Sequence, residues 1–168
     1  IMPQFLKICE KSKGMWYIPG MVVVVVTPTQ TIIKCFGVRE EGKPEKVDED
    51  TIFQLSSLTK VLTASLSCIL ASKGFFELDD KVIKYLPNFK LSNSEVTNKA
   101  TLADLMGHRM GLEGFAGDTF LKAWVKKDKI IENLSVLPVD ANNFRKKYSY
   151  SNVLFGLMGD IITLALHK

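Results

Sequence analysis

Five consecutive valines, Val22 to Val26, restrict the fold of this chain more than any other segment does. β-Branched side chains favour strands, so this short apolar run predicts a buried strand. A second segment rich in β-branched and aromatic residues, Thr31 to Val38, follows four residues later. Pro28, between the two segments, suits the first central position of a β-turn, and the sequence therefore predicts a β-hairpin. Neither segment reaches the roughly 20 apolar residues that a membrane-spanning helix requires, and no membrane span is expected.

Most of the remaining sequence predicts helices. Apolar residues at helical spacing predict a first helix that Gly14 can end, and the clearest helix is expected from about Ser57 to Lys73, before Gly74. Residues 80–85 predict a short helix, and Thr101-Leu102-Ala103-Asp104 has the capping-box spacing that starts another. Residues 120–125 carry an apolar helical pattern, and Asn142-Asn143 indicates a turn. Ser151 or Asn152 can cap a last helix that runs into Leu166.

Two strands do not make a stable sheet alone, because three or more are normally needed. The chain also ends inside a predicted helix. We therefore expect the sheet to be incomplete in this chain.

Composition excludes several classes of protein. The chain has 168 residues and a net charge of +4, from 22 basic and 18 acidic side chains that are scattered along it. This modest excess does not favour a nucleic-acid partner. The three cysteines, Cys9, Cys35 and Cys68, are widely spaced and predict no disulfide framework and no zinc site.

Ser57 and Lys60 form the first candidate chemical pair. Their i, i+3 spacing places both on one helical face, with Cβ atoms about 5–6 Å apart. A serine hydroxyl becomes a good nucleophile when a neighbouring base takes its proton, and a lysine can be that base. The alternative is an N-cap serine beside a solvated lysine, and the pair alone does not decide between the two.

Tyr150-Ser151-Asn152 is the second candidate element. In an extended or turn backbone, residues i and i+2 point the same way, so the phenol and the amide would project together. The phenol could relay protons and the amide could bind a substrate carbonyl. The alternative is a buried tyrosine followed by an N-cap asparagine. We expect His108 to be a structural hydrogen-bonding residue, since no nucleophile elbow supports a Ser-His-Asp triad.

Several segments together resemble a known family. They are Ile18-Pro19-Gly20 before the valine run, Asp50-Thr51-Ile52-Phe53 before Ser57-Leu58-Thr59-Lys60, Ala71-Ser72-Lys73-Gly74 with Leu78-Asp79-Asp80, Thr101 to Met106 before His108-Arg109-Met110-Gly111-Leu112, and Tyr150-Ser151-Asn152. In this order they resemble the serine β-lactamase and penicillin-binding protein family, specifically its class C β-lactamase-like branch. That branch also contains D-alanyl-D-alanine carboxypeptidases, D-aminopeptidases and esterases. The resemblance implies an α+β, β-lactamase/transpeptidase-like fold, with an antiparallel sheet flanked by helices and an all-helical lobe.

The resemblance also implies roles for four residues. Ser57 would be the acylated nucleophile, and its backbone N–H would form half of the oxyanion hole. Lys60 would assist its deprotonation, Tyr150 would act as general base and proton shuttle, and Asn152 would bind the amide of the substrate's acyl side chain. No cofactor and no metal are implied. The implied partner is a small-molecule β-lactam or a D-amino acid peptide.

The sequence departs from the family pattern in places. Met110 replaces the usual serine of a His-x-Ser-Gly-Leu segment, where we expect it to pack. The third box of the family, Lys-Thr-Gly or His-x-Gly on a strand beside the site, is missing. We therefore expect the N-terminal half of such a protein, with a missing C-terminal half as a possible partner, and poor β-lactam hydrolysis by this chain alone.

The expected division of the chain follows the family. Residues 1–56 would hold the first helix and the hairpin of the α/β lobe. Residues 57–150 would hold the active-site helix and the helical lobe, and residues 151–168 a helix that returns toward the α/β lobe. The expected function is a serine β-lactamase in the periplasm or outside the cell. The alternatives are a carboxypeptidase, D-aminopeptidase or esterase of the same family, or a non-catalytic penicillin-binding sensor.

Overall fold

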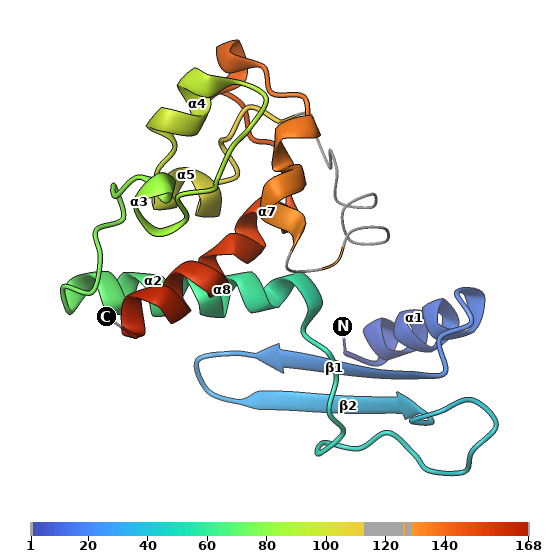
Figure 1. Cartoon of the computed structure of the whole chain (residues 1–168). Helices are drawn as coiled ribbons and strands as arrows, with labels where there is room; N and C mark the ends of the chain where they lie inside the picture. Colours follow the sequence, from blue (N-terminus) through green and yellow to red (C-terminus); the bar gives the residue numbers. More distant parts are fainter. Residues whose placement is uncertain (1, 113–125, 127–128, 168) are drawn as a thin grey trace. The chain divides into compact units, whose positions relative to one another are not determined.

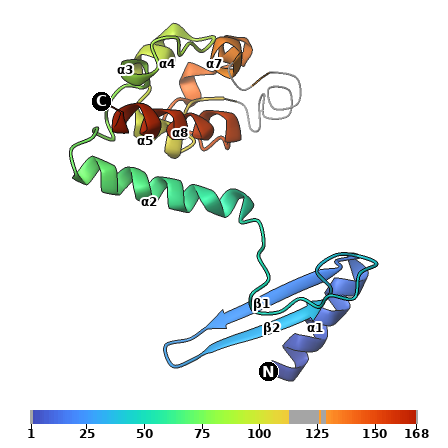
Figure 2. The ribbon, with the colours of Figure 1, turned by 60° about the horizontal axis from the view of Figure 1, so that its bottom comes forward.

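The structure is a computed structural model that describes residues 2–112, 126 and 129–167. The chain forms two compact units, Ile1–Gln54 and Leu55–Lys168, whose elements can be followed in Figures 1 and 2. Among the described residues, no helix combines the length and apolar character needed to cross a bilayer. The boundaries that the sequence suggests at 56/57 and 150/151 stay predictions.

The first unit contains the helix α1 (Met2–Met15) and the antiparallel strands β1 (Gly20–Val26) and β2 (Thr31–Gly37). Val22 pairs with Cys35, and the Thr27 N–H closes the turn by donating to the Gln30 carbonyl at 2.8 Å. The predicted first helix and hairpin are therefore confirmed, but the expected burial of the valine strand is wrong: no residue of β1 is buried, and Val24 and Val26 are 52% and 73% exposed. The described part of the chain contains this one two-stranded sheet.

In its described residues, the second unit contains two long helices and several short ones. They are η1 (Ser56–Leu58), α2 (Thr59–Ser72), α3 (Val82–Tyr85), α4 (Ser94–Lys99), α5 (Leu102–Met106), α7 (Ile130–Asn133), η3 (Leu134–Val136), η4 (Ala141–Asn143) and α8 (Asn152–Leu166). The helices α2, α3 and α5 all contact α8, and the two views show α2 and α8 side by side (Figures 1 and 2).

The apolar side of α8 lies in the hydrophobic core of this unit. Eight of its residues are buried: Val153, Leu154, Phe155, Leu157, Met158, Ile161, Ile162 and Ala165. All of them except Phe155 pack with buried side chains of other elements, among them Leu70, Val82, Leu102 and Leu105. At about 1.5–3 kcal/mol for each buried large apolar side chain, this burial is the main reason that α8 is held where it is. The N-terminus of α8, which carries Asn152, is fixed with it.

The helix α2 buries less of its apolar stripe than the sequence suggests. Leu70 is buried, but Leu58, Leu62, Leu66 and Ile69 remain 66%, 60%, 44% and 52% exposed. The small residue Ser67 is buried as well, and its hydroxyl donates back to the Thr63 carbonyl at 2.9 Å. The face that carries Ser67 and Leu70 is therefore the one that the core covers.

The local signals of helix ends mostly hold. The Thr101 hydroxyl accepts from the Asp104 N–H while the Asp104 carboxylate accepts from the Thr101 N–H, so the predicted capping box is confirmed. Ser151 is the N-cap of α8, as one of the two candidates. The helix expected over residues 120–125 lies outside the described residues. The short helix expected over residues 80–85 is present as α3, whereas the short helices α4 and α7 were not predicted.

Candidate active site

Ser57 lies at the exposed end of α2, although not in the α-helix itself. The sequence predicts a helix that starts at Ser57, whereas the structure has the 3₁₀ turn η1 over Ser56–Leu58 and begins α2 at Thr59. Ser56 has a φ of +48°, a left-handed conformation that is uncommon outside glycine. This turn presents the Ser57 hydroxyl to solvent one turn before Lys60.

The four predicted site residues meet within hydrogen-bonding distance. The Ser57 Oγ lies 2.7 Å from the Tyr150 phenol oxygen. The Lys60 Nζ donates to that same phenol oxygen at 2.6 Å and to the Asn152 Oδ1 at 2.6 Å. The side chains of Lys60, Tyr150 and Asn152 are half-buried, and that of Ser57 is exposed. The structure thus joins residues that lie about 90 positions apart in the sequence.

The direction of these hydrogen bonds places Tyr150 between Ser57 and Lys60. The phenol oxygen accepts from Lys60 and donates to the Asn152 Oδ1 at 3.0 Å. A phenol has one proton, so while Tyr150 donates to Asn152 the Ser57 hydroxyl is the donor in its bond to Tyr150. The residue that can take the serine proton directly is therefore the tyrosine, not the lysine that spacing alone suggested. A lysine ammonium next to the phenol oxygen favours negative charge on it.

The ammonium of Lys60 also lies near aromatic rings. Its Nζ is 4.7 Å from the centroid of the Tyr150 ring and 5.4 Å from that of Phe155. Cation–π attraction at such distances is worth about 0.5–2 kcal/mol. These rings therefore hold the ammonium beside Tyr150 and Asn152.

The backbone around Ser151 aims the tyrosine and the asparagine the same way. Ser151 is extended, with φ −142° and ψ 118°, and its hydroxyl caps α8 by accepting from the Leu154 N–H. The expectation that Tyr150 and Asn152 project together is confirmed by the bond between their side chains. The alternative of Asn152 as the N-cap residue is excluded, because Ser151 has that position.

Backbone hydrogen bonds connect the segment before Tyr150 to the segment after α5. The Ser149 N–H donates to the His108 carbonyl at 2.8 Å, and the Arg145 N–H donates to the Arg109 carbonyl at 2.8 Å. At Gly111, which has a φ of +73°, an added Cβ would lie 2.5 Å from the Asp140 carbonyl oxygen. Glycine is therefore required at this position.

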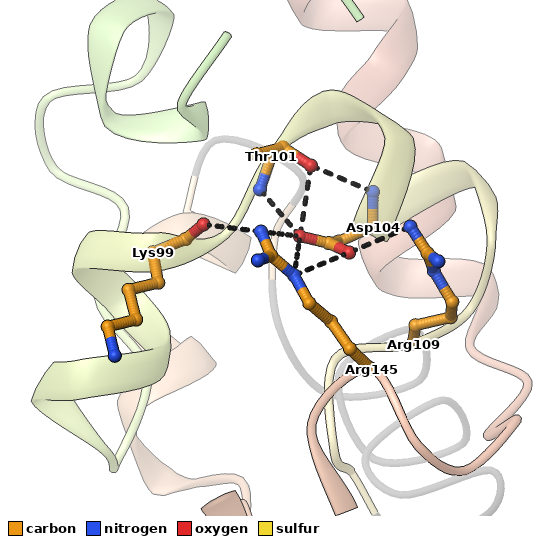
Figure 3. A network of polar contacts seen from close by, with 5 residues as sticks. All are labelled: Lys99, Thr101, Asp104, Arg109 and Arg145. Carbon is orange, nitrogen blue, oxygen red and sulfur yellow. Dashed lines mark hydrogen bonds and ion pairs between the residues drawn. The ribbon is translucent and has the colours of Figure 1, made fainter. Parts of the chain in front are cut away.

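A buried carboxylate anchors the same two segments (Figure 3). Asp104 is fully buried and accepts from Arg109 at 3.0 Å and from Arg145 at 2.8 Å. It also accepts from the backbone and the hydroxyl of Thr101, while Arg145 donates to the Lys99 carbonyl. Burial alone would raise the pKa of Asp104, but the hydrogen bonds from Arg145 and Thr101 outweigh burial and hold that pKa below its usual value.

Sequence reasoning did not identify Asp104 as this anchor. The capping-box spacing is a local signal, and it predicted that Asp104 caps the start of α5. The ion pair of Asp104 with Arg145 joins residues 41 positions apart, and such a contact leaves no local signal in the sequence. The expectation for Met110 is confirmed, because this side chain is 2% exposed and packs in the core.

With this geometry established, comparison with known proteins identifies the family. The family model described as Beta-lactamase matches residues 11–166. The chain therefore belongs to the beta-lactamase family.

The similar proteins are longer than this chain. A beta-lactamase of Psychrobacter immobilis is 27% identical over 162 residues, which are 96% of this chain and 39% of that protein. The D-alanyl-D-alanine-carboxypeptidase/endopeptidase AmpH of Escherichia coli (strain K12) is 26% identical over 153 residues, 89% of this chain and 40% of that protein. The crystal structure of a class C beta-lactamase from Rhodobacter sphaeroides superposes with a TM-score of 0.75 at 26% identity, over 94% of this chain and 42% of that one. The α+β, β-lactamase/transpeptidase-like fold is thereby confirmed, and the chain spans about two fifths of the length of these relatives.

Proposed function

We propose that this chain carries the nucleophilic half-site of a serine hydrolase that forms an acyl-enzyme on Ser57, with β-lactam amides as its substrates. The observation that carries the proposal is the line of short hydrogen bonds from Ser57 through Tyr150 to Lys60, at 2.7 and 2.6 Å. A hydroxyl in contact with a phenol that an ammonium contacts in turn is a nucleophile beside its base. The family to which the chain belongs supports the same class of chemistry.

The proposed reaction proceeds in two stages. Tyr150, as a phenolate balanced by the Lys60 ammonium, takes the Ser57 proton while the serine oxygen bonds to the carbonyl carbon of the lactam. The ring C–N bond then breaks, and the proton held by Tyr150 passes to the leaving nitrogen. Water next attacks the ester on Ser57, gives its proton to Tyr150 and releases the acid, and Ser57 regains a proton. No metal or cofactor takes part in these steps.

Asn152 has a double role in this proposal. Its Oδ1 accepts from Lys60 and, while Tyr150 is protonated, from the phenol, which holds the two groups together. Its amide would bind the carbonyl of the substrate's acyl side chain, as the family resemblance implies. The backbone N–H of Ser57 would be one donor to the oxyanion.

A second candidate substrate is a peptide that ends in D-alanine. The observation that favours it is the similarity to AmpH, whose name describes a carboxypeptidase/endopeptidase, at nearly the same identity as the beta-lactamase relative. Both substrates present an amide to the same serine, and both would require a periplasmic or secreted location, which stays part of this proposal.

Covalent labelling by fluorescent penicillin, followed over time on the purified chain, tests the proposal. Label should form on Ser57 and then decay, and Ser57→Ala should abolish it. Ser65→Ala, which changes another exposed serine further along α2, is the matched control and should label normally. Stable label would instead indicate a penicillin-binding sensor. Labelling that Ser57→Ala leaves unchanged, or no acylation by penicillin or by an activated D-alanyl ester, would refute the proposal.

A further inference from the structure

His108 has a conformation and an environment that its expected structural role does not explain by itself. It follows Gly107, the C-cap of α5, with a φ of +53°. A left-handed conformation is uncommon for a residue with a side chain. The side chain is 7% exposed and its ring lies 4.6 Å from the Tyr150 ring and 5.4 Å from the rings of Tyr148 and Phe155, between centroids.

The hydrogen bonds of His108 bracket Tyr150 on both sides. The His108 carbonyl accepts from the N–H of Ser149 at 2.8 Å, and the imidazole Nδ1 accepts from the N–H of Ser151 at 3.2 Å. The residues before and after the tyrosine are therefore both fixed to one histidine, whose ring also contacts the phenol ring. Since Nδ1 accepts, it carries no proton.

We propose that His108, as a neutral imidazole with its proton on Nε2, is the positioning residue that holds the Tyr150 phenol against Ser57 and Lys60. This inference rests on the proposed function for its kinetic consequence, but not for its structural one. His108 acts through its hydrogen bonds to the backbone on either side of Tyr150.

Protonation of the imidazole removes this positioning. A proton on Nδ1 would face the Ser151 N–H, so that two donors would oppose each other. The ionisable groups around the ring are the phenols of Tyr148 and Tyr150 and the ammonium of Lys60, which lies over the Tyr150 and Phe155 rings. The charged cluster of Asp104, Arg109 and Arg145 lies along the same two segments. A second cation near Lys60 would be unfavourable, and acylation is therefore expected to be slower when the imidazole is protonated.

Two variants separate the hydrogen bond from general packing. In His108→Asn, the Oδ1 of the asparagine takes the place of Nδ1 as the acceptor. The asparagine amide does not titrate, and asparagine tolerates a positive φ. In His108→Gln, the acceptor moves one bond further out, beyond the Ser151 N–H. The probe is p-nitrophenyl acetate, and the readouts are the acylation rate constant and the apparent KM from pH 5 to 9, with circular dichroism to verify folding.

His108→Gln should acylate about tenfold more slowly with KM little changed, the loss expected for one misplaced positioning hydrogen bond. His108→Asn should stay within about threefold of the parent rate, and its acid limb should be flatter. The inference is overturned if His108→Gln matches the parent rate, if His108→Asn is as slow as His108→Gln, or if His108→Asn keeps the parent acid limb.

A second measurement does not depend on activity. Long-range ¹H–¹⁵N correlation spectra at pH 8 report which imidazole nitrogen carries the proton. His167, the other histidine of the chain, is assigned with His167→Gln. The expected result is the Nε2–H tautomer for His108, and an Nδ1–H tautomer would overturn the inference even if the acylation proposal holds. Absence of a burst in the parent chain, with the expected tautomer present, would refute the proposed function alone.

Discussion

Replacing Asp104 by asparagine should destabilise the second unit strongly. The carboxylate is fully buried and accepts from Thr101, Arg109 and Arg145. An asparagine keeps one acceptor oxygen but turns an NH₂ group toward donors, so about two charge-assisted bonds are lost, at roughly 1.5–3 kcal/mol each. The arginine side chains are 45% and 46% exposed, and water can solvate them after the change. We therefore expect a loss of about 3 kcal/mol, the lower end for a broken buried pair.

Urea unfolding followed by circular dichroism measures this loss. Asp140→Asn is the matched control, because Asp140 is exposed and caps η4 by accepting from the Asn142 N–H, a role that asparagine fills equally well, and the second bond, from the Asn143 amide, is exposed and can be replaced by water. The control should change the free energy of unfolding by less than about 0.5 kcal/mol. A loss below about 1 kcal/mol in Asp104→Asn would contradict the anchoring role that the structure gives this carboxylate.

Two further predictions concern acid stability and a glycine. Burial tends to raise the pKa of Asp80, but hydrogen bonds from Lys84 and Tyr85 outweigh it and lower that pKa from 3.8 to about 2. The unfolded chain therefore binds protons more readily, so the stabilisation is complete above about pH 5 and is lost as pH falls from 4 toward 2. Urea midpoints measured against pH should show this loss of stability, and Asp80→Asn should make the loss smaller. A pH profile that Asp80→Asn leaves unchanged would contradict the prediction. Separately, Gly111→Ala should cost at least about 2 kcal/mol more than Gly74→Ala, because both glycines have a positive φ but only the Cβ at Gly111 would meet a backbone oxygen. An equal loss in the free energy of unfolding of the two variants would contradict this prediction, because the backbone at Asp140 would then move away from the added Cβ at little cost.

Local patterns in the sequence predicted several of the elements in each unit. The valine run and Pro28 gave the hairpin, and the Thr101-to-Asp104 spacing gave a capping box that the structure contains. The i, i+2 rule gave the common direction of Tyr150 and Asn152, because Ser151 is indeed extended. These features depend on neighbours in the sequence, and for that reason a pattern can reveal them.

Features that depend on distant contacts were not predictable in this way. The first turn at Ser57 is 3₁₀ and not α-helical, and the phenol of Tyr150 intervenes between Ser57 and Lys60. The pairing of Asp104 with Arg145 likewise joins segments 41 residues apart. A local pattern gives the residue types of such contacts but not their partners. The resemblance to a family supplied what the pattern could not, namely that residues 57, 60 and 150 belong to one site.

The central proposal is that Tyr150 activates the Ser57 hydroxyl, and intact-mass spectrometry of the chain after reaction with p-nitrophenyl acetate tests it most directly. The parent chain should gain one acetyl group, and peptide mapping should place it on Ser57. Tyr150→Phe, which keeps the ring and removes the phenol oxygen, should gain it at least about 100-fold more slowly, as expected for loss of a general base. Acetylation of Ser57 in Tyr150→Phe at the parent rate, or an acetyl group on another residue in the parent chain, would contradict the proposal.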